Sequence, residues 1–135
     1  MNWIADCSIA VAWCFDDEAT SRTESLLDRT QQDALILPLH WPLEVTNVLQ
    51  GAVKRGRLTE SQACRSAEIL MSLPIRFDLN THLAAFPATY ELARKHQLTT
   101  YDAAYLELAM RVTAPLATND RQLARAAAQC GVLLW

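Results

Sequence analysis

Long apolar runs are missing from this sequence of 135 residues. No apolar stretch reaches the roughly 18 residues that a membrane-spanning helix needs, so we expect no membrane segment. The first residues also lack the basic stretch and the small-residue cleavage site of a signal peptide. These two absences favour a cytoplasmic protein.

Clustered cysteines and a strong charge of one sign are absent as well. The four cysteines are scattered without a CxxC pair, and no histidine is spaced to complete a zinc site with them. We therefore interpret the cysteines as reduced core residues. The formal net charge is -3, so the surface as a whole lacks the basic character typical of nucleic-acid-binding domains.

The composition is nevertheless that of a folded domain with a substantial core. Hydrophobic residues make up 51% of the chain and charged residues 20%, and this length is usual for one domain. Short runs rich in Ile, Val and Leu alternate with longer stretches of helical period, a pattern typical of βα units around a parallel sheet. We expect residues 1–135 to form a single α/β domain, a sandwich with helices on both faces of the sheet.

The apolar runs and helical stretches give explicit boundaries. Thr59 followed by Gln62 has the spacing of a capping box at the start of a helix. Strands are predicted at 2–5, 34–38, 75–77, 115–118 and 132–135. Helices are predicted at 8–14, 17–31, 41–54, 59–71, 83–96, 100–112 and 120–129.

Four of the fifteen acidic residues interrupt the local apolar pattern. Asp6 ends the first predicted strand and Asp120 directly follows the fourth, where open parallel sheets have their ligand crevices. Glu44 and Asp102 each lie on the apolar stripe of a predicted helix and are expected to face inward. His40, four residues before Glu44, is within reach of a hydrogen bond to it, although a half-buried histidine needs no such role.

Each aspartate also has a simpler interpretation as a helix cap, and that alternative stays open for Asp6, Asp102 and Asp120. Glu44 resists it, because a glutamate in the middle of an apolar helix face caps nothing. A buried carboxylate normally needs a cation, an ion-pair partner or a proton. If the first and fourth strands are neighbours, the four acids converge and call for a divalent cation.

The types of ligand indicate which cation this would be. A site with only oxygen donors suits Mg²⁺ or Mn²⁺ and disfavours zinc. Ions held by carboxylates commonly serve in phosphodiester hydrolysis, where they lower the pKa of the attacking water. The hydroxyls of Ser8 and Thr118, each two residues from an acid, are placed to orient carboxylates or bind metal waters, although both residues also suit helix starts and turns.

The four acids and their surroundings resemble a known family. Asp6 in "ADCSIAVAW", Glu44 in "LPLHWPLEVTNVL", Asp102 in "LTTYDAAYLELA" and Asp120 in "PLATNDRQLARAA" resemble, in order and in neighbouring sequence, the PIN-domain ribonucleases. Within that family the chain is most similar to the VapC-type toxins of toxin–antitoxin pairs. The resemblance runs from Asn2 to the final "GVLLW".

The resemblance implies a PIN-like three-layer sandwich with a five-stranded parallel sheet, a Mg²⁺ or Mn²⁺ centre and endonucleolytic cleavage of RNA. It makes the four acids catalytic and metal-binding residues, with Ser8, Asn47 and Thr118 as supporting polar positions. It also implies a homodimer and a cognate antitoxin protein. A groove beside the amphipathic segment 17–31 is the expected seat for that partner.

Basic residues near the acids are possible RNA contacts. Lys54, Arg55 and Arg57 follow the helix that bears Glu44, and Arg121 follows Asp120. Lysine and arginine can position an RNA backbone without reading its sequence. The simpler interpretation is that they are solvated charges near helix ends.

Two other functions remain as alternatives to a metal-dependent ribonuclease. A phosphoacceptor domain of the receiver kind also has acids at strand ends, but it requires a lysine near the last strand, and the only lysines are Lys54 and Lys95. A non-catalytic PIN-like module that binds RNA or protein would be favoured by the loss of an acid, and none is missing.

Overall fold

A computed structural model describes all residues from 1 to 135. Its sheet has four parallel strands in the order β3-β2-β1-β4. The strands are β1 (Asn2–Ala5), β2 (Ala34–Pro38), β3 (Ile75–Asp78) and β4 (Leu116–Ala117). The helices are α1 (Cys7–Cys14), α2 (Ser21–Arg29), α3 (Trp41–Lys54), α4 (Glu60–Met71), α5 (Thr81–Ala84), α6 (Tyr90–His96), α7 (Thr100–Val112) and α8 (Arg121–Gln129). A kinked segment, η1 (Ala85–Thr89), joins α5 to α6.

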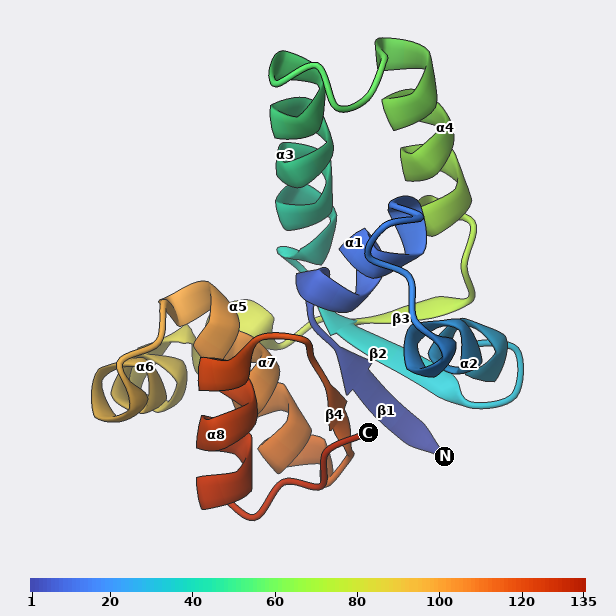
Figure 1. Cartoon of the computed structure of the whole chain (residues 1–135). Helices are drawn as coiled ribbons and strands as arrows, with labels where there is room; N and C mark the ends of the chain where they lie inside the picture. Colours follow the sequence, from blue (N-terminus) through green and yellow to red (C-terminus); the bar gives the residue numbers. More distant parts are fainter.

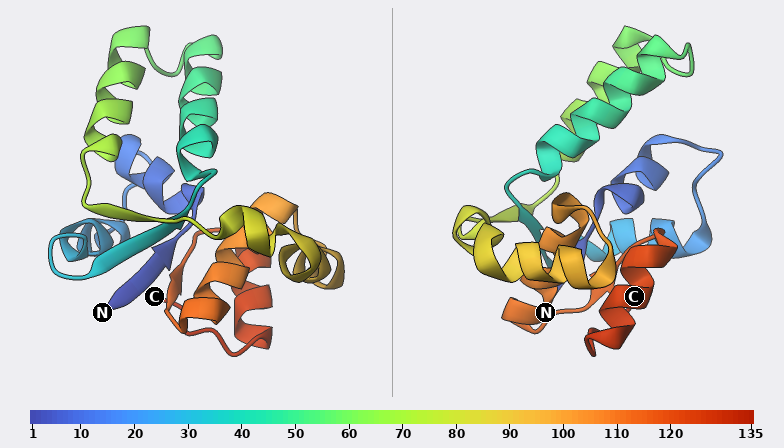
Figure 2. Two further views of the ribbon diagram at one scale, coloured as in Figure 1. Left: turned by 180° about the vertical axis from the view of Figure 1, so that it is seen from behind. Right: turned by 90° about the vertical axis from the view of Figure 1, so that its left-hand side faces the viewer.

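The helices lie in distinct groups around this sheet (Figure 1). α1 and α2 lie on one side of it and α5 to α8 on the other, and α3 and α4 form a hairpin that projects from the rest of the molecule (Figure 2). The α/β architecture with helices on both faces of a parallel sheet is therefore confirmed. No helix is long and apolar enough to cross a membrane.

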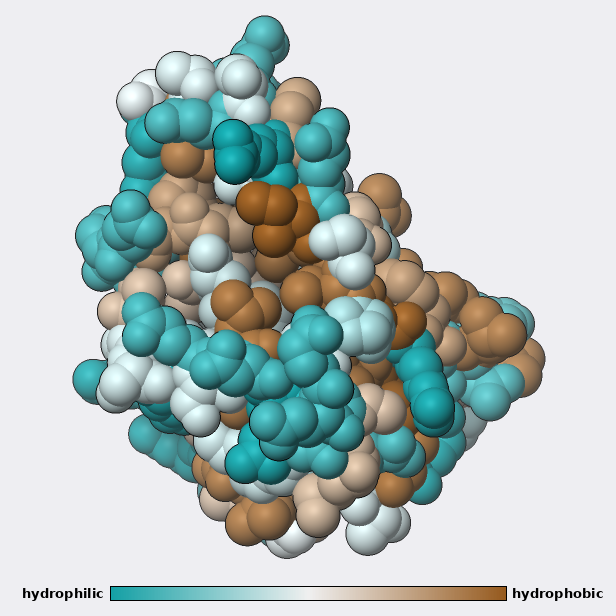
Figure 3. Space-filling view, turned by 90° about the vertical axis from the view of Figure 1, so that its right-hand side faces the viewer, coloured by the Kyte–Doolittle hydropathy of each residue, from teal (hydrophilic) through white to brown (hydrophobic).

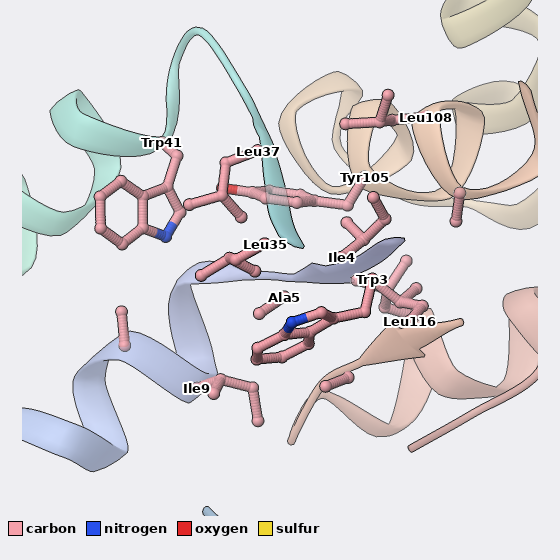
Figure 4. Close-up of a cluster of buried hydrophobic side chains, with 14 of the residues drawn as sticks. Trp3, Ile4, Ala5, Ile9, Leu35, Leu37, Trp41, Tyr105, Leu108 and Leu116 are labelled. Carbon is pink, nitrogen blue, oxygen red and sulfur yellow. The ribbon is translucent and has the colours of Figure 1, made fainter. Parts of the chain in front are cut away.

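The core forms because β1 is apolar on both faces, as expected for a strand inside a parallel sheet. Ile4 faces Tyr105 of α7, and Trp3 and Ala5 face Ile9 of α1 (Figure 4). These side chains belong to one contiguous cluster of 22 buried residues. The short strand thereby fixes one helix on each face of the sheet and presents its carboxyl end between them.

The prediction of a fifth strand at 132–135 is wrong. The final segment makes a single β-bridge, between Leu134 and Leu116, supported by a hydrogen bond from the Leu116 amide to the Leu133 carbonyl. β4 itself has only two residues, so it offers too short a ladder for a full partner strand.

Two predicted helices differ from the structure. The segment 17–31 begins as a turn, and α2 starts only after Thr20, which forms a capping box with Thr23 that the prediction missed. The predicted helix 83–96 is broken at Phe86, whose backbone is extended (φ -141°, ψ 132°). Phe86 precedes Pro87, and a residue before proline avoids the helical conformation.

A charged network ties the end of β3 to α7. The Arg111 guanidinium donates to the carboxylates of Asp78 (2.7 Å) and Glu107 (2.8 Å), and both acids are largely buried. Burial by itself would raise the pKa of Asp78, but hydrogen bonds from Arg111 and from the Asn80 amide hold it below the ordinary value.

We predict that Arg111→Met destabilises the protein by roughly 2 kcal/mol at pH 7, because two buried acids lose their partner. The depressed pKa means that the pair stabilises the fold above the ordinary aspartate pKa of 3.8, and this contribution is lost as the pH falls below that value. Urea unfolding of the wild type and of Arg111→Met at pH 7 and pH 3 measures this difference in the free energy of unfolding. A stability difference that is equal at the two pH values would contradict the prediction.

Candidate acidic active site

Asp6 lies at the carboxyl end of β1 and caps α1. One carboxylate oxygen accepts hydrogen bonds from the amide of Ser8 (3.1 Å) and from its hydroxyl (2.5 Å). The other oxygen accepts from the Thr118 hydroxyl at 2.6 Å. Only 4% of the Asp6 surface is exposed, so its carboxylate is held in one orientation by groups from two separate chain segments.

The turn between β4 and α8 comes next to Asp6 because β4 pairs with β1. Ala5 is in register with Ala117, and the Asp6 amide donates to the Ala117 carbonyl. The Thr118 hydroxyl that donates to Asp6 also accepts from the Asp120 amide at 2.9 Å. The structure thus brings together Asp6, Asp120 and the two hydroxyl residues, Ser8 and Thr118, that the sequence placed near them.

Asp120 is exposed and serves as the N-cap of α8, where its carboxylate accepts from the Leu123 amide at 2.8 Å. The capping interpretation is therefore correct for both Asp6 and Asp120, and in both cases it coexists with convergence on the sheet edge. For Asp102 it is wrong, because Thr99 caps α7 and accepts from the Asp102 amide. The Asp102 carboxylate is consequently free of that role.

Glu44 is half-buried on the first turns of α3 and is held by two neighbours. The hydroxyl of Tyr105, a fully buried residue of α7, donates to Glu44 Oε1 at 2.6 Å. His40 Nε2 lies 3.1 Å from the same oxygen and 3.1 Å from the Tyr101 carbonyl. Glu44 Oε1 and the Tyr101 carbonyl oxygen both act as acceptors, so His40 Nε2 carries a proton. The sequence left the His40 contact open and missed Tyr105, whose only signal was its place on the stripe that also bears Asp102.

The carboxylates are close enough to affect one another's ionisation. Burial raises the pKa of Asp6 to about 6, against hydrogen bonds from Ser8 and Thr118 and with a further rise from the Asp102 charge. Burial also raises the pKa of Asp102, and the charges of Glu44 and Asp120 add to the rise. All four acids therefore contribute to one crowded region of negative charge.

The Cys7 thiol beside this region is inert. Burial, together with repulsion from the carboxylates of Glu44 and Asp6, raises the pKa of Cys7 to about 12. A thiol that remains protonated is a poor nucleophile, which agrees with its interpretation as a packing residue.

The acids fit a hard divalent cation in donor type, since the only donors are oxygens. In the present side-chain arrangement, however, no three acidic, histidine or cysteine groups are grouped tightly enough to hold a metal ion. Hydrogen bonds explain this spread: Asp120 is turned toward its helix and Glu44 toward Tyr105. Like charges gain more from these donors than from approaching one another.

The remaining predicted residues are placed differently. Asn47 lies one turn after Glu44 on the wall of an open groove along α3, without a hydrogen bond to the acids. Lys54 and Arg55 are at the far end of α3, about 15 Å along the helix from Glu44. Arg121 begins α8 beside Asp120.

Arg57 has partners of its own, away from the acids. Its guanidinium forms ion pairs with Asp17 (2.8 Å) and Glu18 (3.3 Å) and stacks on the Phe15 ring. The interpretation of Arg57 as an RNA contact therefore gains no support from its surroundings.

Arg22 is a residue of the site region that the sequence reasoning missed. From the first turn of α2 it donates to Asn119 Oδ1 at 3.0 Å, and it also reaches the carbonyls of Thr118 and Trp135. It thus fastens the turn that carries Thr118 and Asp120. No local pattern marks it, because its partners lie 96 to 113 residues away in the sequence.

These features define an α/β protein with a carboxylate-rich candidate active site at the carboxyl edge of a parallel sheet. The family model described as "PIN domain" matches residues 4–129. The chain belongs to the PIN-domain family, which confirms the resemblance inferred from the sequence.

Individual proteins are similar to the chain over nearly its full length. "Ribonuclease VapC3" of Pyrobaculum aerophilum is 31% identical over 125 residues, which cover 92% of this chain and 93% of the relative. The structure of VapBC2 from Rickettsia felis bound to a DNA fragment from their promoter has a TM-score of 0.70 at 14% identity, with coverage of 100% of this chain and 98% of that chain. The structure of Mycobacterium tuberculosis VapC20, a sarcin-ricin loop cleaving toxin, has a TM-score of 0.65 at 15% identity, with coverage of 93% and 95%. The structural likenesses, at these identities, show the fold.

We predict that Asp6→Asn stabilises the metal-free protein at pH 7.5. The pKa of Asp6 rises from 3.8 to about 6 in the folded state, so ionisation of this buried group costs stability as the pH increases through that interval. The gain is about 2 to 3 kcal/mol at pH 7.5 and vanishes below pH 4. Thermal unfolding in EDTA across this pH range measures it, and a variant that is less stable than the wild type at pH 7.5 would contradict the prediction.

Proposed function

We propose that this PIN-domain protein is an endoribonuclease that depends on Mg²⁺ or Mn²⁺ and acts as the toxin of a VapBC-type pair. The observation that carries the proposal is that Asp6, Glu44, Asp102 and Asp120 lie near one another at one edge of the sheet, close enough to affect one another's ionisation. The identity to a protein named "Ribonuclease VapC3" over nearly the whole chain, and the likeness of the fold to that of a sarcin-ricin loop cleaving toxin, support it.

Each residue has a definable part in such a reaction. Asp6 and Asp102 would be the principal ligands, with Glu44 and Asp120 acting directly or through water. A bound divalent ion would lower the pKa of the attacking water and neutralise negative charge at the phosphate. Ser8 and Thr118 hold the Asp6 carboxylate, and Tyr105 and His40 hold Glu44. Arg121, at the start of α8, would contact a phosphate of the RNA.

The alternatives have less support. Membership of the PIN-domain family excludes the receiver domain. A non-catalytic PIN-like module would be expected to lack part of the acidic set, and all four acids are present.

We predict that the wild-type protein cleaves RNA with Mg²⁺ or Mn²⁺ and that Asp6→Asn and Asp102→Asn lower the rate roughly 100-fold or more, because each removes a charge at the reacting centre. The assay is incubation with total cellular RNA, with and without EDTA. Asp28→Asn, the same chemical change on an exposed helix position, is the matched control and should cleave normally.

Three outcomes would contradict parts of this proposal. Cleavage that persists in EDTA removes the metal dependence. Equal rates for the wild type and Asp6→Asn remove the site assignment. The absence of cleavage of any RNA favours the binding module.

The seat proposed for the antitoxin is a groove between the α1–α2 connection and α4. The cavity measures about 790 Å³, and apolar side chains from Trp13, Leu27, Ile69 and Leu73 line it. Figure 3 shows apolar surface gathered between α4 and α2, with hydrophilic surface around it. An apolar groove with a charged rim is the shape that receives the apolar face of an amphipathic helix.

We expect that Ile69→Asp prevents binding of the antitoxin, because a charge enters an apolar contact, while RNA cleavage stays unchanged. Ile69 is 54% exposed, so the substitution should not disturb the core. The measurement is co-purification with the product of a short neighbouring reading frame for a small DNA-binding protein, which the toxin role predicts. Met71→Asp, an exposed position of the same helix outside the groove, is the control.

Two results would contradict the proposed antitoxin seat or the toxin role. Normal co-purification with Ile69→Asp places the antitoxin elsewhere, and the absence of a neighbouring reading frame of this kind contradicts the toxin role. The expected homodimer is tested by light scattering on the purified toxin.

A further inference from the structure

We propose that Arg22, in the first turn of α2, is a positioning residue of the acidic centre that sets the orientation of the Asp6 carboxylate. This inference rests on the proposed ribonuclease function and extends the site beyond the four acids. Arg22 forms no hydrogen bond or ion pair with an acid, and its partners in the site belong to the turn between β4 and α8. Its influence on Asp6 therefore passes through that turn.

Two successive amides of the turn act on Asp6 through two hydroxyls. The Asn119 amide donates to the Ser8 hydroxyl at 2.8 Å, and that hydroxyl donates to Asp6 Oδ1. The Asp120 amide donates to the Thr118 hydroxyl at 2.9 Å, and that hydroxyl donates to Asp6 Oδ2. A hydroxyl that accepts a hydrogen bond becomes a stronger donor. The placement of these two amides therefore fixes both oxygens of the Asp6 carboxylate.

Arg22 fastens the turn that carries the two amides. Nη1 donates to Asn119 Oδ1 at 3.0 Å, and Nη2 donates to the Thr118 carbonyl at 3.4 Å. Nη2 also donates to the Trp135 carbonyl, so one guanidinium joins the turn to the final segment. β4 contributes only two residues to the ladder behind the turn, so strand pairing alone holds the turn at few points.

The helix α2 is a fixed base for Arg22. The Trp13 indole donates to the Thr23 carbonyl at 2.7 Å, and the Arg29 guanidinium lies 4.1 Å from the centroid of the Trp135 ring. Arg22 and Arg29 are seven residues apart and therefore lie on the same face of the helix. Because α2 is attached near both ends, the Arg22 side chain extends from a rigid element, which an orienting group requires.

The role of Arg22 is separable from the stability of the fold. Arg22 is exposed and has no acid partner, so water can replace its hydrogen bonds without leaving a buried charge. A guanidinium is planar and rigid and holds several acceptors at once, which separate water molecules do not. Loss of Arg22 therefore leaves the protein folded and the Asp6 carboxylate less well oriented.

The first test is binding of Mn²⁺ by the whole chain, followed as free Mn²⁺ by electron paramagnetic resonance. Arg22→Met should weaken binding roughly 10-fold, the lower end of the range for groups that orient metal ligands. Arg22→Lys, which keeps a charged donor but not the planar fork, should give an intermediate affinity. Arg94→Met is the matched control, since Arg94 is exposed and forms no hydrogen bond or ion pair, and it should bind Mn²⁺ as the wild type does.

The kinetics of RNA cleavage distinguish a positioning residue from a direct RNA contact. At low Mn²⁺, Arg22→Met should cleave roughly 10-fold more slowly than the wild type. Saturating Mn²⁺ should restore the rate, and the KM for RNA should stay unchanged. A raised KM that Mn²⁺ does not correct would make Arg22 an RNA contact and overturn the proposal.

A further readout needs no metal. In EDTA, the amide hydrogens of Asn119 and Asp120 should exchange with solvent roughly 10-fold faster in Arg22→Met, because the turn loses hydrogen bonds from a charged donor. NMR measures this exchange. The amide of Leu106, a fully buried residue of α7, reports on the fold and should exchange as in the wild type.

Asn119→Ala tests the path from Arg22 to the acids. It removes the side-chain acceptor of Arg22 and keeps the amide that donates to Ser8, so Mn²⁺ binding should weaken in the same direction. The double variant with Arg22→Met should bind little more weakly than Arg22→Met alone, because both substitutions remove one contact. Fully additive effects would contradict the path.

The outcomes separate this inference from the proposed function. If the wild type binds Mn²⁺ and cleaves RNA but Arg22→Met keeps its Mn²⁺ affinity or its amide exchange, the inference is wrong and the ribonuclease function stands. Faster exchange of the Leu106 amide as well would make Arg22 a residue of general stability, which also overturns the inference. If the wild type neither binds Mn²⁺ nor cleaves RNA, the proposed function fails, and the positioning of a metal ligand by Arg22 fails with it.

Discussion

The pairing of β1 with β4 is the constraint on which the site depends. Two register pairs, Ile4 with Leu116 and Ala5 with Ala117, join segments more than one hundred residues apart. They bring the Thr118 hydroxyl to Asp6 and place the start of α8 beside the start of α1. Because parallel strands deliver their carboxyl ends to one edge, a ladder of only two residues is sufficient to assemble half of the acidic centre.

The same polar groups serve both folding and the proposed chemistry. Asp6 and Asp120 satisfy the first amides of α1 and α8, which any helix start requires. The capping bonds also fix where the carboxylates point. The remaining cost is the mutual repulsion of the acids, seen in the raised pKa values of Asp6 and Asp102. A protein can retain this destabilising repulsion at a site whose acids bind a cation, either alone or together with a phosphate.

The other half of the centre is supported from the core. Tyr105 is buried at the contact of α7 with the sheet, and its hydroxyl reaches Glu44 on α3. His40 extends this contact to the Tyr101 carbonyl. These side-chain contacts thus tie the position of Glu44 to α7, the helix that also carries Asp102.

The sequence by itself determined the alternation of strands and helices, the four acids and the family, because hydrophobic period and residues next to strand ends are local signals. It could not determine the missing fifth strand, the break at Phe86 or the partners of Arg57 and Arg22. Those depend on pairing lengths and on contacts between distant segments. Only the tertiary structure decided which acids act as caps and what holds Glu44, since both result from side chains that no sequence period brings together.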